Sequence, residues 1–273
     1  MSKAFSPGNI SCIFMICYNS EPALMHSLGV GFTTDKGVVV DTTESRKTEI
    51  VFNNKTIDFQ TLISALRMLT EKPVRVVIDS ELPLGCGFGL SGACTLATVL
   101  AVNNLFLLGK SEEEMAMIAH IAEVRNSTGL GDIAGQFNGG FLMKTKSGNP
   151  LAVERLNVKE KAVYYKVFGA LHTKSILKDK VLVRKINLAG DYALEKIKQI
   201  KTPTLSEIIR ISREFAEKSE LLKSPEVINQ IREIEESGGN ASMIMLGNAV
   251  YSDVEFVGCE RIEVSKRRAC LIE

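Results

Sequence analysis

The stretch P-L-G-C-G-F-G-L-S-G-A, residues 83–93, holds four glycines within eight residues and is the most informative part of the chain. An apolar run, V-R-V-V-I at 74–78, precedes it, and a mainly apolar segment at 93–108 follows it. This order predicts a strand, a glycine-rich loop and a helix. Glycine allows positive φ and close approach to a ligand, and a helix starting behind such a loop points its free N–H groups at it. We therefore predict a phosphate-binding loop.

Upstream of this loop, the chain alternates short β-prone runs with turn residues. The segments P-G-N at 7–9 and D-K-G at 35–37 are expected to form turns rather than strand centres. Apolar residues at helical spacing over 58–70 predict one helix. The β-prone runs are 10–17, 30–33, 38–41 and 49–52.

Downstream, Ser111 and Glu114 have the spacing of a capping box, which predicts a helix to roughly residue 124. Residues 125–140 are expected to form a second glycine-rich loop, which carries a single acid, Asp132. A boundary near 155–170 divides the chain into two expected domains, 1–160 and 161–273. The remaining expected elements are strands at 141–146 and 162–168, helices at 204–220 and 225–236, and a terminal β segment.

The composition narrows the class of protein. With 273 residues, 45% of them apolar and 24% charged, the chain can build an ordinary globular core. A net charge of +1 with both signs interspersed argues against a nucleic-acid partner. The apolar segment at 93–108 is too short to span a bilayer, so no membrane partner is expected. Because no secretory signal is visible and the six cysteines show no CxxC or finger-type spacing, we expect a cytoplasmic protein.

Two other phosphate-loop motifs fit less of the chain. The Walker-type motif G-x-x-x-x-G-K-[ST] finds its Gly-Lys-Ser at 109–111, but Asn104 stands where its first glycine belongs. A dinucleotide fingerprint matches Gly87, Gly89 and Gly92. However, it lies far into the chain, and the acid expected about 20 residues later falls in the predicted capping box. Both remain weaker hypotheses.

The spacing P-x-G-x-G-x-G-x-S-x-A at 83–93 resembles the phosphate loop of the GHMP kinases, which include galactokinase and the homoserine, mevalonate and phosphomevalonate kinases. Ser91 matches the second of two family serines, while Leu90 replaces the first. Asp132, followed seven and eight residues later by two glycines at 139–140, resembles the second family signature. A glycine-rich segment at 237–243 resembles the third signature only weakly.

Within that superfamily, the chain is most similar to the archaeal pantoate kinases. The resemblance implies an α+β, two-domain fold: an N-terminal ATP-binding domain like the second domain of ribosomal protein S5, and a ferredoxin-like C-terminal domain. It also implies an ATP-dependent phosphotransferase that phosphorylates the primary hydroxyl of pantoate to 4-phosphopantoate in archaeal coenzyme A biosynthesis. The resemblance is carried by residues 6–11, 85–93, 123–124, 128–134 and 241–248.

Other functions stay open beside this one. A pantothenate kinase would act on the same hydroxyl of a substrate whose carboxyl is extended by β-alanine. Another GHMP kinase of a small hydroxy acid or sugar, or a non-catalytic ligand-binding member of the fold, would keep much of the same pattern. In each case we expect a small-molecule ligand, bound by a monomer or by a homodimer.

The resemblance implies roles for single residues, with ATP and Mg²⁺ as cofactors. Ser91 and Glu123 would ligate Mg²⁺, a hard cation that prefers oxygen ligands. Asp132 would accept the proton of the acceptor hydroxyl or orient it toward the γ-phosphate. Alternatively, Glu123 is a solvated helix acid and Asp132 a turn residue. The ATP phosphates would bind to the backbone of Gly85, Cys86, Gly87, Phe88, Gly89, Leu90, Ser91 and Gly92.

The acceptor side departs from the family pattern. Many GHMP kinases have Lys or Arg after the N-terminal Pro-Gly, where this chain has Asn9, an amide that cannot neutralise a phosphate. His120 is expected to be structural, and His26 is placed in a turn facing the N-terminal motif. A carboxylate acceptor needs a cation, for which Arg46, Arg125 and Lys144 are candidates. The substrate-binding candidates are Asn9, His26, Thr128, Gly129 and Arg125.

Overall fold

The structure is a computed structural model that describes residues 1–170 and 179–273, so His172 lies outside the described residues. In chain order the elements are β1 (Ser2–Cys17), β2 (His26–Glu44), β3 (Glu49–Phe52), β4 (Lys55–Thr56), α1 (Gln60–Leu69), β5 (Val74–Ser80), α2 (Leu90–Phe106), α3 (Glu112–Asn126), α4 (Asp132–Asn138), β6 (Phe141–Lys144), β7 (Glu154–Arg155), β8 (Ala162–Gly169), α5 (Lys180–Lys198), α6 (Leu205–Lys218), α7 (Pro225–Glu236), β9 (Ala241–Met243), β10 (Asn248–Ser252), β11 (Glu260–Glu263) and β12 (Cys270–Ile272).

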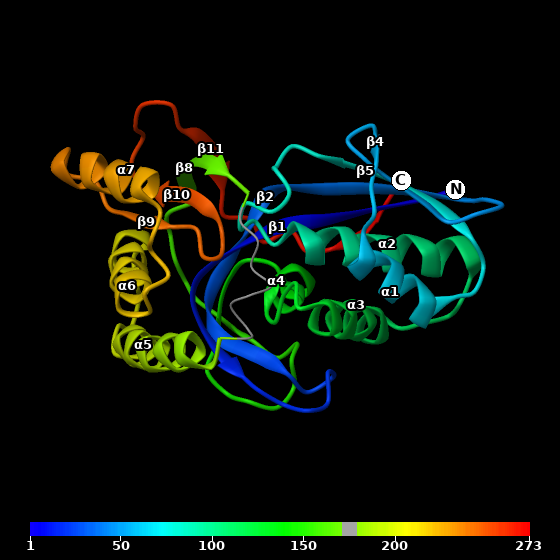
Figure 1. Cartoon of the computed structure of the whole chain (residues 1–273), viewed down its shortest axis with the longest axis horizontal. Helices are drawn as coiled ribbons and strands as arrows, with labels where there is room; N and C mark the ends of the chain where they lie inside the picture. The colour runs from blue at the N-terminus through cyan, green and yellow to red at the C-terminus, as the bar shows by residue number, and fades with distance from the viewer. Residues whose placement is uncertain (171–178) are drawn as a thin grey trace.

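The larger sheet has the strand order β12-β1-β2-β5-β3-β4, and β6 and β7 are attached to it through β2. Helices α1, α2 and α3 lie together on one of its faces (Figure 1). Helix α2 packs against β1 and β2 on one side and against α1 and α3 on the other. Because it is covered on both sides, α2 is apolar all round rather than amphipathic.

The two turns expected in the first fifty residues are wrong, since β1 and β2 run straight through both segments. Pro7 pairs with Gly37 and Asn9 with Thr33, so three residues of β2 lie opposite Gly8 in a β-bulge. A bulge tolerates a proline and lets the strands continue past it. The strands approach closely here, because a Cβ on Gly37 would lie 2.2 Å from the Ser6 carbonyl oxygen.

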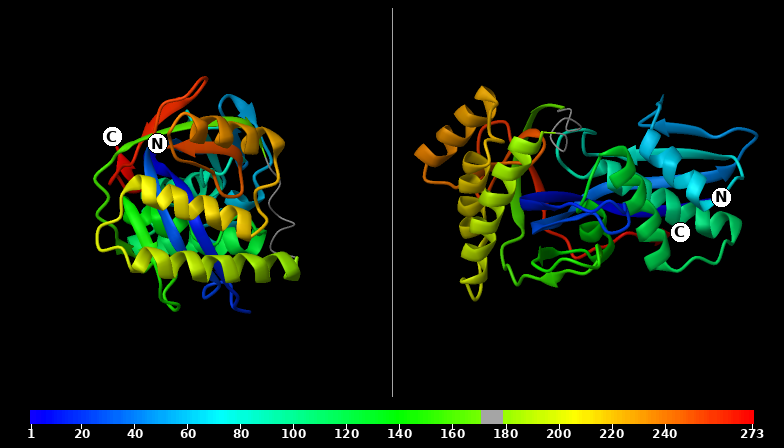
Figure 2. Two further views of the ribbon diagram at one scale, coloured as in Figure 1. Left: turned by 90° about the vertical axis from the view of Figure 1, so that its left-hand side faces the viewer. Right: turned by 60° about the horizontal axis from the view of Figure 1, so that its bottom comes forward.

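The smaller sheet has the order β11-β8-β10-β9, and α6 and α7 pack on it (Figures 1 and 2). Helix α5, which the sequence did not predict, packs against α6 and the far half of β1. The Asn187 amide of α5 makes two hydrogen bonds to the backbone of Ile16, of 2.7 and 3.0 Å. Strand β1 therefore contacts elements of both halves of the chain.

The change from one sheet to the other falls between β7 and β8, at the proposed boundary of 160/161. The final strand β12 returns to the larger sheet and pairs with residues 3–5 of β1. Both chain ends consequently lie close together (Figure 1). We keep domains 1–160 and 161–273 as a proposal, with residues 270–272 contributing to the larger sheet.

Candidate active site

The glycine-rich loop between β5 and α2 is shaped by three glycines with positive φ: 79° at Gly85, 89° at Gly87 and 61° at Gly89. Two of them are also places of close approach. A Cβ on Gly87 would lie 2.6 Å from Cγ2 of Ile244, and a Cβ on Gly89 would lie 2.9 Å from Oδ1 of Asp132. Since Gly89 is also the N-cap of α2, the start of this helix faces Asp132 directly.

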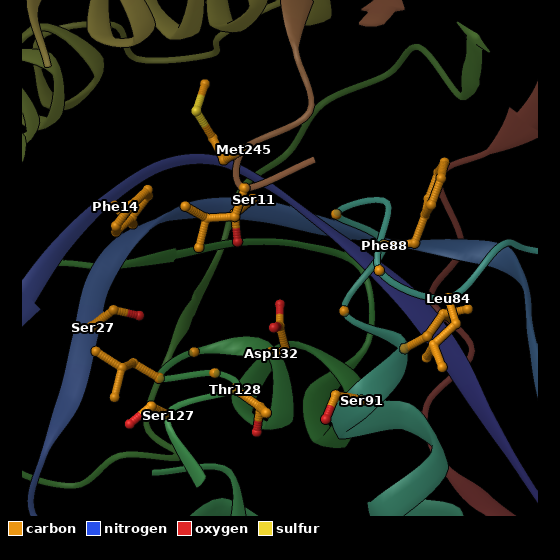
Figure 3. Close-up of a pocket in the computed structure, with 18 of the residues that line it drawn as sticks. Ser11, Phe14, Ser27, Leu84, Phe88, Ser91, Ser127, Thr128, Asp132 and Met245 are labelled. Atoms are coloured by element: carbon orange, nitrogen blue, oxygen red, sulfur yellow. The ribbon is translucent and has the colours of Figure 1, made fainter. Parts of the chain in front are cut away.

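A cavity of about 290 Å³ lies beside this loop. Its walls come from the loop itself, residues 127–132, the turn at 245–246, and strands β1 and β2. Figure 3 shows the Asp132 carboxylate pointing into the cavity, with Ser91 and Thr128 on the helical side and Met245 on the opposite side. Polar groups from distant parts of the chain thus meet around one space beneath the phosphate loop.

Ser91 and Glu123 form a hydrogen bond between the first turn of α2 and the last turn of α3. The Ser91 hydroxyl donates to Oε1 of Glu123 over 2.6 Å. Glu123 is only 1% exposed, so it is not a solvated helix acid. Burial raises the pKa of Glu123 to about 8; the hydrogen bond from Ser91 opposes this rise, and the nearby Asp132 adds to it.

The second oxygen of this carboxylate, Oε2, is buried and receives no hydrogen bond from any described residue. An unpaired buried carboxylate oxygen is costly unless a cation or donor meets it. The Ser91 hydroxyl and Glu123 therefore fit an oxygen-preferring ion such as Mg²⁺, which usually takes one or two protein ligands plus phosphate and water. No cluster of three His, Cys, Asp or Glu side chains that could hold a metal occurs in residues 1–170 and 179–273.

Asp132 is the first residue of helix α4, so the expectation of a continuous loop over 125–140 is wrong. The helix has seven residues and Gly139 is its C-cap, which accounts for the fixed spacing between the acid and the glycine pair. A Cβ on Gly139 would lie 2.5 Å from the Lys266 carbonyl oxygen. Desolvation raises the pKa of Asp132 to about 6, and a 2.8 Å hydrogen bond from the Asn9 amide opposes that rise.

Among the expected substrate-binding residues, Thr128 and Gly129 line the cavity. Gly129 leaves no room for a side chain, because a Cβ there would lie 2.6 Å from Oε2 of Glu123. Arg125 and His26 do not line it. Arg125 contacts Met68 on the surface, and His26 is the buried first residue of β2, not part of a turn.

Two residues of the phosphate loop and the third glycine-rich segment differ in how they relate to the cavity. Cys86 is buried and its side chain does not line the cavity, while Leu90 is buried at the start of α2 and does. The segment 237–243 does not line the cavity. The neighbouring turn at 244–247 reaches the phosphate loop instead, where a Cβ on Gly247 would lie 2.2 Å from the Cys86 carbonyl oxygen.

Sequence reasoning missed the contributions of β1, β2 and this turn to the cavity. These residues are polar or apolar side chains without a recognisable spacing. The runs 6–11 and 241–248, which contain Ser11, Met245 and Leu246, had been noted only as part of the resemblance. The missed residues are Ser11, Phe14, Ser27, Met245 and Leu246.

Comparison with known proteins agrees with this geometry. The family described as GHMP kinases N terminal domain matches residues 59–140. The pantoate kinase of Methanocaldococcus jannaschii is 33% identical over 258 residues, which are 90% of each chain, and that of Thermococcus kodakarensis is 32% identical over 92% of this chain and 86% of its own. This chain belongs to the GHMP kinase family.

Solved structures confirm the α+β fold expected for a GHMP kinase. A phosphotransferase related to the CoA biosynthesis pathway superimposes with a TM-score of 0.86 at 26% identity, covering 98% of this chain and 97% of the other. A homoserine kinase from Cytophaga hutchinsonii has a TM-score of 0.71 at 19% identity, covering 99% and 97%, which supports the fold alone. In the part of this GHMP kinase that the structure describes, no helix is both long and apolar enough to span a membrane.

A second, smaller cavity of about 50 Å³ adjoins the first and shares Ser11, Phe14, Ser27 and Gly131 with it. Lys144 of β6 lines this cavity and is only 7% exposed. Its ammonium group donates to the carbonyl oxygens of Asn149 and Pro150 over 2.7 and 2.5 Å, and no described carboxylate forms an ion pair with it. Burial lowers the pKa of Lys144 to about 8.

Proposed function

We propose that this GHMP kinase transfers the γ-phosphoryl group of ATP to the primary hydroxyl of pantoate, giving 4-phosphopantoate for coenzyme A biosynthesis. The observation that carries the proposal is the Asp132 carboxylate, which faces the cavity where the phosphate loop meets α2. The likeness to curated pantoate kinases over about nine-tenths of the chain supports pantoate as the acceptor.

On the nucleotide side, the backbone N–H groups of residues 85–92 would hold the phosphates. The positive φ values at Gly85, Gly87 and Gly89 support this role, since they bend the backbone around a concave loop. Ser91 and Glu123 would hold Mg²⁺. When bound, this ion would neutralise charge that develops on the phosphate oxygens.

On the acceptor side, Asp132 would hold the hydroxyl in line with the γ-phosphate and take its proton. With a pKa of about 6, its carboxylate is mainly ionised at neutral pH and remains basic enough to accept a hydrogen bond or a proton. Phosphoryl transfer passes through a loose transition state, so on the acceptor side the protein accelerates the reaction mainly by positioning the hydroxyl. Thr128 and Gly129 would form the adjoining wall.

Lys144 is the best candidate to bind the carboxylate of the acceptor. Unlike Arg46 and Arg125, which are exposed and line neither cavity, it lines the smaller cavity that adjoins the Asp132 side of the site. Below about pH 8 its ammonium group is charged, and an incoming carboxylate would supply the missing anion. The small volume of this cavity favours the short carboxylate end of pantoate over the β-alanine extension of pantothenate.

The test is a side-by-side assay of ADP release with Mg-ATP and pantoate, pantothenate, mevalonate, homoserine or shikimate. We expect the highest kcat/KM with pantoate. A preference for pantothenate would support the alternative kinase, and absence of turnover with all five would support a non-catalytic ligand-binding protein. Protection against heat by Mg-ATP, but not by NAD(P), would exclude the dinucleotide hypothesis.

Two hypotheses about the whole molecule accompany this proposal. The enzyme would act on small molecules either as a monomer or as a homodimer, which light scattering at assay concentrations distinguishes. It would work in the cytoplasm, where ATP and the acceptor are both present. Fractionation of the source cells followed by immunodetection would test this location.

A further inference from the structure

Asn9 occupies a position that links the two halves of the candidate site. It lies directly after the bulge at Pro7 in strand β1 and is 5% exposed. Its backbone N–H donates to the carbonyl oxygen of Phe88 in the phosphate loop over 2.8 Å. Its side-chain amide donates to Oδ1 of Asp132 over the same distance. One residue of β1 therefore contacts both the phosphate loop and the acid at the start of α4.

The surrounding backbone fixes the place of this amide. A Cβ on Gly135 would lie 2.2 Å from Oδ1 of Asn9, and a Cβ on Gly89 would lie 3.2 Å from Cβ of Asn9. Both positions must therefore lack a side chain for Asn9 to reach Asp132. The phosphate loop is also held by an aromatic contact: the Phe88 ring packs edge-on against the Tyr165 ring, with the ring centroids 5.1 Å apart.

The bonding pattern divides the two oxygens of Asp132 between different tasks. Oδ1 accepts the hydrogen bond from Asn9, whereas Oδ2 receives none from the described residues, and the carboxylate points into the larger cavity (Figure 3). Asn9 does not line the larger cavity but lines the smaller one, and its side-chain amide N–H is already donated to Asp132. Its amide is thus better placed to hold Asp132 than to bind the acceptor, which was the role expected from the sequence.

We propose that Asn9 is a positioning residue that fixes the Asp132 carboxylate relative to the phosphate loop and leaves Oδ2 for the acceptor hydroxyl, an inference whose catalytic part rests on the proposed function. A neutral amide does this without forming an ion pair, so it holds the orientation of the carboxylate and lowers its basicity less than a cation in the same place would. The contact joins residues 123 positions apart in the sequence. Because Asn9 also bonds to the phosphate loop, it would set the distance between the phosphoryl donor and the acceptor group.

The catalytic test compares Asn9→Ala and the less disruptive Asn9→Ser with Asn138→Ala. Asn138 lies on the same helix α4, but its amide bonds to the carbonyl oxygens of Ala134 and Leu151 instead. Loss of orientation at a reacting group can cost about 100-fold in rate. We expect kcat to fall by about this factor in the Asn9 variants with little change in either KM, while Asn138→Ala lowers thermal stability and keeps kcat.

A double-mutant cycle separates positioning from direct binding. In an Asp132→Ala background, which leaves the Asn9 amide no acceptor at position 132, Asn9→Ala should cause no further loss of residual kcat, because Asn9 acts through the carboxylate. A raised acceptor KM in Asn9→Ala, or losses that multiply in the double variant, would overturn the inference in favour of substrate binding. These measurements use whichever acceptor the wild-type protein phosphorylates, so failure with pantoate alone affects only the proposed function.

The same cycle can be measured without any substrate. Hydrogen bonds to charged groups typically change an equilibrium constant by about tenfold or more. Urea unfolding of the wild type, Asn9→Ala, Asp132→Ala and the double variant should therefore show a coupling of about tenfold in the unfolding equilibrium constant. Additive effects in this cycle would overturn the inference even for a protein that phosphorylates none of the tested acceptors.

Discussion

The phosphate loop and the acceptor side of the cavity are built in contrasting ways. The loop is one continuous stretch, residues 85–92, and its shape follows from the backbone conformation of its glycines. Neighbouring residues approach these glycines so closely that a side chain would not fit. The acceptor side combines single side chains from β1, β2, β6 and α4, which lie far apart in the sequence. Binding by backbone leaves a local sequence pattern, whereas binding by side chains depends on tertiary structure. The two regions should accordingly respond differently to substitution.

The largest effect is expected at Asp132, where the two regions meet. Asp132→Asn keeps the size of the side chain and its place at the start of α4, but removes the base. General base catalysis contributes typically about 10²- to 10⁴-fold, so kcat should fall within that range while the KM for ATP changes little. Steady-state ADP release measures both parameters, and heat protection by Mg-ATP shows whether the nucleotide still binds. Turnover at the wild-type rate would remove Asp132 from the mechanism.

Glu123 should show opposite effects on activity and stability. Burial holds its folded-state pKa near 8, above its ordinary value of 4.5. Between pH 4.5 and 8 the unfolded chain therefore ionises Glu123 while the folded protein keeps it protonated, and the free energy of unfolding falls as the pH rises through this range. Glu123→Gln is neutral in both states and removes this cost, so we expect the free energy of unfolding of the metal-free protein to rise by about 1–3 kcal/mol at pH 7. Its Mg²⁺-dependent kcat/KM should fall by about 10²- to 10³-fold, because a charge-stabilising ligand is lost.

Glu113→Gln is the matched control for that experiment, since Glu113 lies exposed on the first turn of the same helix α3. It should change neither thermal stability nor the Mg²⁺ concentration that gives half-maximal rate. If Glu123→Gln lowers stability and leaves the Mg²⁺ dependence unchanged, Glu123 is a structural acid that pairs only with Ser91.

A smaller, purely local effect is expected within the phosphate loop. Gly87 combines φ of 89° with a position where a Cβ would meet Ile244, while Gly148 has φ of 124° and nothing within 4 Å. Gly87→Ala should weaken nucleotide binding through about 1–3 kcal/mol of backbone strain and overlap. Gly148→Ala, which adds strain alone at a residue that lines neither cavity, should leave nucleotide affinity unchanged. Isothermal titration with ADP measures both, and equal affinities would mean that loop shape does not limit binding.

The contrast between the two regions also explains what could be predicted from the sequence. The strand, loop and helix around residues 74–106 were predicted because their signals are local. The straight course of β1 through Pro7 was missed because sheet pairing and a bulge outweigh the turn preference of Pro-Gly. Helix α4 was missed because it has only seven residues, one of them Gly135, so its propensity is low and packing stabilises it.

The candidate site shows the same division. Ser91, Glu123 and Asp132 were chosen from the resemblance to the GHMP kinase motifs and lie around one cavity or beside its wall. Their roles stay predictions, but their proximity did not need any knowledge of the fold. By contrast, the burial of Lys144 and the contact between Asn9 and Asp132 depend on strand pairing over long sequence distances. A local pattern contains no information about such contacts. His26 and Arg125 were therefore chosen as substrate-binding residues without knowledge of the tertiary structure.

The smallest expected effect is at Lys144 and tests the acceptor side alone. Because burial lowers its pKa to about 8, Lys144 is mostly charged at pH 7 and loses its charge as the pH rises through 8. If its ammonium group binds the acceptor carboxylate, the KM for pantoate should rise by about tenfold between pH 7 and pH 9, with the KM for ATP changing less. Lys144→Met should have this raised KM at pH 7 and show no further rise with pH. Arg125→Met, on the surface, should keep the wild-type profile, whereas a pH-dependent KM that persists in Lys144→Met would assign the carboxylate to another cation.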